Sequence, residues 1–254
     1  MSPSNPMIVA MADLRMALKV RYVKYSLIMV GLLGPIMTTA MMIMVFAFTS
    51  PTSPDYSMMV AIMMPTGASL LALISAIPAS LIAANTIVGE KEQKTLEPLL
   101  ATPLTDRELI WGKTLSAFIP SIVLLYGGTL LSTLAIIIGL IVLGQPPILF
   151  PDLPGAFLIF GVGPIVVLAV VSVMILVSER VSRVYEAYQT GTLAVMVLLI
   201  PMFGSFSSLG TSTTDQSTIW FINILTFLLA SVIAVVTWVL ALKTFNRDHL
   251  ISVV

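Results

Sequence analysis

Residues 86–114 read TIVGEKEQKTLEPLLATPLTDRELIWGKT, and nine of the 24 charged residues of the chain lie in this stretch, between Glu90 and Lys113. The chain has 254 residues, of which 58% are hydrophobic and only 9% are charged, whereas about 25% of the residues in a soluble domain are charged. On both sides of the stretch, more than about twenty residues are almost free of charge. A lipid bilayer must therefore surround most of the chain. We call residues 89–113 the elbow.

The apolar runs on either side of the elbow are long enough to cross a membrane, which takes about 20 residues in a helix. The sequence predicts an all-α, polytopic membrane protein with a single transmembrane domain over residues 1–254. Because the second and third spans are long, we expect both to continue beyond the hydrocarbon as helix, joined by the elbow. The six predicted spans are residues 26–48, 57–88, 114–143, 155–177, 190–209 and 218–242.

Lysine and arginine are distributed with a strict alternation between the two sides of the predicted spans. All 12 lie before the first span, in the elbow, between the fourth and fifth spans, or in the C-terminal tail. The loops on the other side carry only Asp55, Asp152 and Asp215 as charged residues. Since basic loops remain in the cytoplasm, the sequence predicts a multi-pass protein of the plasma membrane with both termini cytoplasmic.

A further helix is predicted before the first span, over residues 7–25. Its apolar side chains follow spacings of three and four, with Asp13 and Lys24 on the opposite side and Arg15, Lys19 and Arg21 at the flanks. This pattern favours a helix lying in the cytoplasmic membrane interface and contacting lipid. The alternative is that the segment is simply the cytosolic start of the first span. The apolar stripe comprises Met7, Met11, Leu14, Leu18, Tyr22 and Tyr25.

Several positions at membrane depth interrupt the apolar runs with glycine or proline, among them Pro65, Pro78, Pro120 and Gly163-Pro164. Plain helix bending and a functional hinge fit these positions equally well. The outer loop at 144–155 holds four prolines and an Ile-Leu-Phe cluster, and we expect it to fold back on the outer membrane surface. Hydroxyl side chains in the spans are candidates for the lining of a path, but such groups more often bond to their own helix. They include Thr66, Ser69, Ser75, Ser80, Ser205 and Ser207.

The spans lack the acidic, basic and metal-binding side chains that proton transfer or catalysis would need. No charged residue or histidine lies in the middle of a span, and the chain has no cysteine, so we expect no proton-driven carrier, no intramembrane enzyme, no metal and no cofactor. A net charge of zero predicts no nucleic-acid partner. Gly112-Lys113-Thr114 resembles the end of a phosphate-binding loop, but Arg107 stands where that motif needs glycine. We therefore expect no nucleotide binding by this chain.

The elbow itself has recognisable helix signals. Thr105 and Glu108 have the spacing of a capping box, which predicts that a helix begins near Asp106 and runs into the third span. Thr95 is a candidate N-cap for a short helix at 96–101, with Pro98 in its first turn. A short crosswise helix between two long helices could transmit a push from a cytosolic partner. A solvated connector with good caps fits the sequence equally well.

The elbow also resembles the signature of the ABC type-2 transporter permeases. The matching residues run from Gly89 to Thr105 (GEKEQKTLEPLLATPLT), followed by Glu108-Leu109 and Gly112-Lys113. The resemblance implies the permease subunit of an exporter, paired with a second permease copy or homologue and driven by a separate cytosolic ATPase. An ATP-independent channel or facilitator is the alternative. The helix at 96–101 would be the coupling helix that docks on the ATPase.

The resemblance also implies roles for individual elbow residues. Charged and polar side chains would contact the ATPase or hold the ends of the helices, and three leucines would fill an apolar groove of the partner. No residue would be catalytic, since ATP hydrolysis would take place on the other subunit. The implied coupling residues are Glu90, Glu92, Lys94, Thr95, Leu96, Glu97, Leu99, Leu100, Thr105, Asp106 and Glu108.

Overall fold

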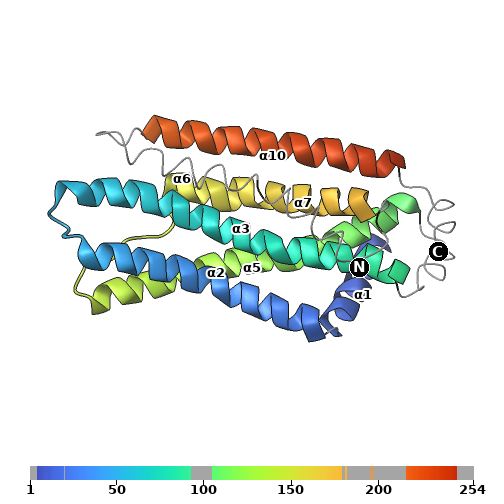
Figure 1. The fold of residues 1–254 in the computed structure, drawn as a ribbon, viewed down its shortest axis with the longest axis horizontal. Helices are drawn as coiled ribbons and strands as arrows, with labels where there is room; N and C mark the ends of the chain where they lie inside the picture. Colours follow the sequence, from blue (N-terminus) through green and yellow to red (C-terminus); the bar gives the residue numbers. More distant parts are fainter. Residues whose placement is uncertain are drawn as a thin grey trace.

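Long helices lying side by side make up the part of the chain that the structure describes (Figure 1). The structure is a computed structural model that describes residues 5–19, 21–92, 105–178, 181, 196 and 216–244. In these ranges the chain is helical and holds no strand. The elements are α1 (Asn5–Lys19), α2 (Arg21–Phe48), α3 (Pro54–Glu92), α5 (Asp106–Val142), α6 (Leu153–Ala156), the π-helical segment η1 (Phe157–Val162), α7 (Gly163–Ser178) and α10 (Gln216–Thr244).

Five of the predicted spans are confirmed as helices long and apolar enough to cross a membrane. These stretches agree with the predicted spans to within a few residues, except that the third begins seven residues earlier. The remaining predicted span, the fifth at residues 190–209, lies outside the described residues except for Met196. The five stretches are Val23–Phe48, Tyr56–Thr86, Arg107–Val142, Leu153–Val177 and Ser217–Lys243.

The helices next to the elbow are the longest of those described. Helix α3 has 39 residues and α5 has 37, so each is about 55–58 Å long at 1.5 Å per residue. A hydrocarbon layer of about 30 Å cannot contain either of them. Both helices therefore extend well beyond the membrane core, as the lengths of the apolar runs predict.

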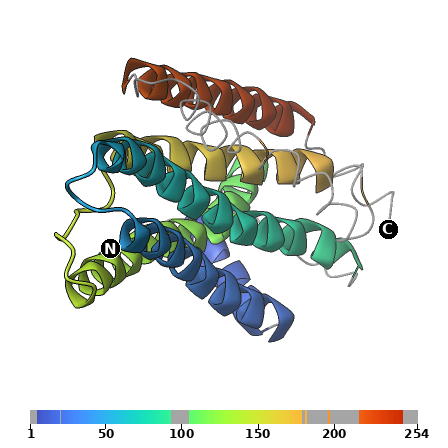
Figure 2. The same ribbon diagram turned by 60° about the vertical axis from the view of Figure 1, so that its left-hand side comes forward.

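Helix α3 lies at the centre of the bundle and packs against α2, α5 and α7. In its most apolar stretch 72% of the residues are buried, against 22% for α2 and 17% for α10. Helix α10 packs on α7 and lies on the side of the bundle away from α2 (Figure 2). The outward faces of α2, α5 and α10 carry large exposed apolar side chains, which suit contact with lipid.

Most of the proline interruptions are absorbed within helices. Helix α3 continues through Pro65 and Pro78, and α5 continues through Pro120. At Gly163-Pro164 the interruption is larger, because the preceding six residues form the π-helical segment η1 before α7 begins. A proline has no N–H to donate to the turn before it, and a wider turn next to it accommodates this loss.

One residue of the outer loop, Phe150, turns into the bundle, and the position of the loop on the outer membrane surface stays a prediction. Phe150 is buried at 1% exposure, and its carbonyl accepts a hydrogen bond of 2.7 Å from Thr133 Oγ1 in α5. A Cβ atom at Gly67 of α3 would lie 2.8 Å from Met42 Cε of α2 and 3.2 Å from the Phe150 ring, so this glycine leaves space for α2 and for the ring. Leu149, beside it, is 73% exposed.

The basic residues in the described ranges gather at one end of the bundle. They lie on α1, at the start of α2, at the end of α3, at the start of α5 and at the end of α10 (Figure 1). The described segments at the other end of the bundle carry no basic residue. This agrees with the alternation read from the sequence. The residues are Arg15, Lys19, Arg21, Lys24, Lys91, Arg107, Lys113 and Lys243.

Candidate coupling site

The elbow joins α3 to α5 at the basic end of the bundle. Helix α3 ends at Glu92 and α5 begins at Asp106. Glu90 and Glu92 therefore occupy the last turn of α3, and Thr105, Asp106 and Glu108 frame the start of α5. The predicted helix at 96–101 lies outside the described residues and stays a prediction, as do the positions of Lys94, Thr95, Leu96, Glu97, Leu99 and Leu100.

The predicted capping box is present at the start of α5. Thr105 Oγ1 accepts a hydrogen bond of 3.3 Å from the Glu108 amide, and Glu108 Oε2 accepts one of 2.9 Å from the Thr105 amide. Thr105 Oγ1 also donates to Glu108 Oε2 at 2.8 Å. Two amides that the helix cannot satisfy are thereby bonded reciprocally. The point within the elbow at which α5 begins is thus fixed.

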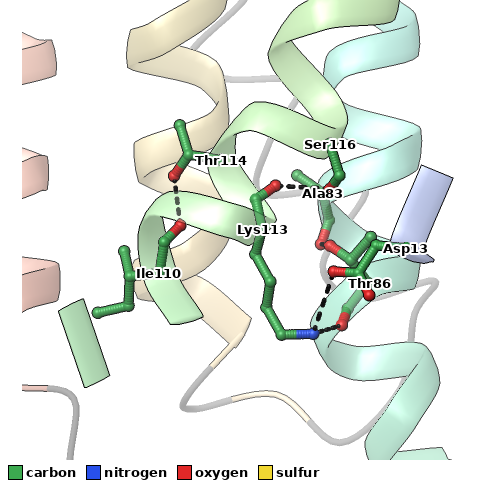
Figure 3. A network of polar contacts seen from close by, with 7 residues as sticks. All are labelled: Asp13, Ala83, Thr86, Ile110, Lys113, Thr114 and Ser116. Atoms are coloured by element: carbon green, nitrogen blue, oxygen red, sulfur yellow. Dashed lines mark hydrogen bonds and ion pairs between the residues drawn. The ribbon is translucent and has the colours of Figure 1, made fainter. Parts of the chain in front are cut away.

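Below this cap, Lys113 is buried at 3% exposure and joins three helices (Figure 3). Its Nζ lies 3.8 Å from Asp13 Oδ2 of α1 and donates a hydrogen bond to the Thr86 carbonyl of α3. Asp13 is also buried at 3% exposure. A buried charge is expensive without a partner of opposite sign, so this ion pair ties α1 to the base of α5.

Burial raises the pKa of Asp13 above the ordinary value of an aspartate, while the positive charge of Lys113 acts in the opposite direction. The ion pair is long for a hydrogen bond, and Asp13 Oδ2 accepts none from the part of the chain that the structure describes. Loss of water therefore outweighs the attraction of Lys113. The charge of Lys113 is therefore what favours the ionised form of Asp13.

The role of Asp13 differs from the sequence-based expectation. The helix predicted over residues 7–25 is divided, because α1 ends at Lys19 and residues 21–25 begin α2. In α1, the side opposite the apolar stripe packs against protein and not against water. Val9, Ala10, Asp13 and Ala17 are buried, whereas Met11 and Leu18 of the stripe are 51% and 43% exposed. One signal could have indicated this: Asp13 is the only acidic residue among the first 54, in a segment rich in basic residues.

Hydroxyl groups on α3 are bonded within their own helix. Thr66 Oγ1 donates to the Ile62 carbonyl at 2.7 Å, and Ser69 and Ser75 donate to carbonyls three residues earlier. Ser80 does the same at 2.8 Å. These four side chains therefore show the ordinary helical back-bonding that the sequence analysis gave as the alternative to a path. Ser205 and Ser207 lie outside the described residues.

An apolar cleft of about 220 Å³ opens between α5, α7 and α10, near the basic end of the bundle. The rings of Trp111 and Trp238 lie beside it with their centroids 4.6 Å apart. Ser172, the one hydroxyl in its wall, donates to the Leu168 carbonyl at 2.7 Å. Among the described residues, the wall of the cleft thus offers apolar contact and no acid or base. Its lining is Trp111, Leu168, Ser172, Ala234, Val235, Trp238 and Val239.

Comparison with known proteins gives one finding. A family model described as ABC-2 family transporter protein matches residues 17–185. The matched region includes the end of α1, the whole of α2, α3 and α5 with the elbow, and the chain through α7. No curated protein matches the sequence.

Proposed function

The chain belongs to the ABC-2 family of transporter proteins, whose model matches more than half of it, and from this premise we propose that it drives export with energy from a separate cytosolic ATPase. It is a membrane-embedded, multi-pass permease subunit of an ABC transporter. Subunits of this family are transport components and not catalysts. In our proposal, ATP is hydrolysed on the partner, and the permease supplies the path.

The elbow is the point at which we propose that the ATPase acts. The observation that carries this proposal is the construction of the elbow's base: α3 and α5 project beyond the membrane core, the start of α5 is capped, and a buried ion pair joins α5 to α1. A force applied to a rigid helix end is transmitted along the helix, whereas a loose connector would absorb it. The proposed contact residues are Glu90, Glu92, Lys94, Thr95, Leu96, Glu97, Leu99, Leu100, Thr105, Asp106 and Glu108.

We also propose a dimer of permeases in the plasma membrane, with the translocation path between the two copies. Both termini and the elbow lie in the cytoplasm in this arrangement. Helix α1 lies in the cytoplasmic interface, with the exposed side chains of Ile8, Met11, Met16 and Leu18 toward lipid. The exposed cations of Arg15, Lys19 and Lys24 suit contact with lipid headgroups.

Purification from the native membrane tests the proposed function. We expect a soluble ATPase subunit to remain attached to the chain. Vesicles holding both subunits are expected to move a solute from a panel of ions, amino acids and amphipathic dyes only when ATP is supplied. Solute movement by the chain alone, without nucleotide, would instead identify an ATP-independent channel or facilitator.

The proposed orientation predicts a labelling pattern, because the natural chain has no cysteine. Single cysteines replacing Asp55, Asp152 or Asp215 are expected to react with a membrane-impermeant maleimide added to intact cells. A cysteine replacing Lys94 is expected to react only after the cells are opened. The reverse pattern would overturn the orientation.

A further inference from the structure

The Gly112-Lys113 pair of α5, which the sequence analysis expects not to bind phosphate, has surroundings that point to another role. A Cβ atom at position 112 would lie 2.7 Å from Val9 Cβ and 3.1 Å from the Pro6 carbonyl oxygen. Real Cβ atoms are essentially never found as close as the first of these distances. Glycine at this position therefore allows the backbone of α5 to come against α1.

The facing surface of α1 matches this site. Pro6, Val9 and Asp13 are spaced by three and four residues, so they lie on one side of the helix. Val9 and Asp13 are buried, at 7% and 3% exposure, whereas Met11 on the opposite side is 51% exposed. Pro6 and Val9 lie against Gly112, and Asp13 pairs with Lys113.

Lys113 extends the contact to a third helix. Its Nζ donates to the carbonyl of Thr86, which lies in α3 six residues before the last residue of that helix. Thr86 Oγ1 donates in turn to the Ala83 carbonyl at 3.0 Å. In Figure 3 the lysine side chain leaves α5 and reaches the space between Asp13 and Thr86. One side chain thus joins α1 to both helices that the elbow connects.

We propose that Gly112 and Lys113 are positioning residues that form the docking site for the N-terminal helix. Through them, α1 and the adjoining ends of α3 and α5 move as one rigid unit. When the ATPase pushes on the elbow, α1 is displaced with it along the membrane surface. The docking follows from the contacts alone, and the displacement rests on the proposed function.

Distances between two spin labels test the docking in the purified chain. The labels are placed at Met16 of α1 and Val123 of α5, which are 54% and 63% exposed. Gly112→Ala is expected to lengthen and broaden the distance distribution, because its methyl group collides with Val9. Gly127→Ala is the matched control on the same helix, since a Cβ there meets nothing within 4 Å, and it is expected to leave the distribution unchanged.

A second variant keeps the test informative if Gly112→Ala folds poorly. Asp13→Asn removes one charge of the ion pair with little change of shape, and we expect it to broaden the same distribution. Circular dichroism and size-exclusion profiles should match the parent, which would separate a displaced α1 from general unfolding. Folded Asp13→Asn and Gly112→Ala variants that both keep the parent distribution would overturn the docking proposal.

The rigid unit is tested in the complete transporter with the same two labels. We expect the distribution to be the same in the nucleotide-free and nucleotide-bound states. A shift on nucleotide binding would show that α1 separates from α5 and would overturn the rigid unit. If no ATPase binds to the chain, the proposed function fails, while the docking result on the purified chain still stands.

Discussion

Replacing Lys113 with methionine is expected to lower the free energy of unfolding by about 3–5 kcal/mol, because it leaves a buried carboxylate without its cation. Lys113 and Asp13 are each only 3% exposed, so water cannot take the place of the lost charge. The hydrogen bond to the Thr86 carbonyl is lost as well. Unfolding in mixed micelles, followed by circular dichroism, would measure the change.

The double variant Asp13→Asn/Lys113→Met should be less destabilised than Lys113→Met alone. Removing both charges abolishes the unpaired carboxylate, and replacement of a whole buried pair is often close to neutral. Lys19→Met is the control, since Lys19 is an exposed lysine of α1 and surface substitutions usually change stability by less than about 0.5 kcal/mol. A Lys113→Met variant as stable as Lys19→Met would contradict the assigned role of the ion pair.

The loss should also depend on pH. Burial already raises the pKa of Asp13, and Lys113 is the group that lowers it, so its removal raises this pKa further. A carboxyl group with a higher pKa in the folded state binds more protons there than in the unfolded state. Stability then falls as pH rises from the ordinary aspartate pKa through the raised one. The Lys113→Met variant should therefore lose more stability at alkaline than at mildly acidic pH.

The sequence predicted those features that depend on neighbouring residues along the chain. A continuous apolar run defines a span by its length, and the capping box at Thr105 and Glu108 sets the start of α5 through residues three apart. Both are local, and both are present in the structure. Which side of α1 is buried against protein was not predictable in this way, because it depends on what α1 packs against.

The contact between Asp13 and Lys113 joins residues one hundred positions apart. Periodicity could place Asp13 opposite the apolar stripe, but it could not distinguish water from protein on that side. Phe150 is a similar case, since a loop rich in proline gives no sign of which ring enters the bundle. In both cases the space is provided by a distant glycine, Gly112 for α1 and Gly67 for Phe150.

The elbow leads to the second large expected effect, Leu99→Asp, which should weaken binding of the ATPase by about 2 kcal/mol or more, or about thirtyfold. We propose that Leu99 enters an apolar groove of the partner, where a carboxylate would lose its water without gaining a cation. Leu99 stands in the sequence between the end of α3 at Glu92 and the start of α5 at Asp106, so we expect its substitution to leave the spans undisturbed. Co-purification of the two subunits would measure the loss.

Leu149→Asp is the matched control for the same change of side chain. Leu149 is 73% exposed and belongs to the loop between α5 and α6, at the opposite end of the bundle from the elbow. This variant should retain the ATPase, because the proposed docking surface is untouched. Glu97→Lys should also weaken binding, through charge and not through apolar contact. Unchanged association and ATP turnover in both elbow variants would remove the coupling role from residues 96–101, whatever the permease transports.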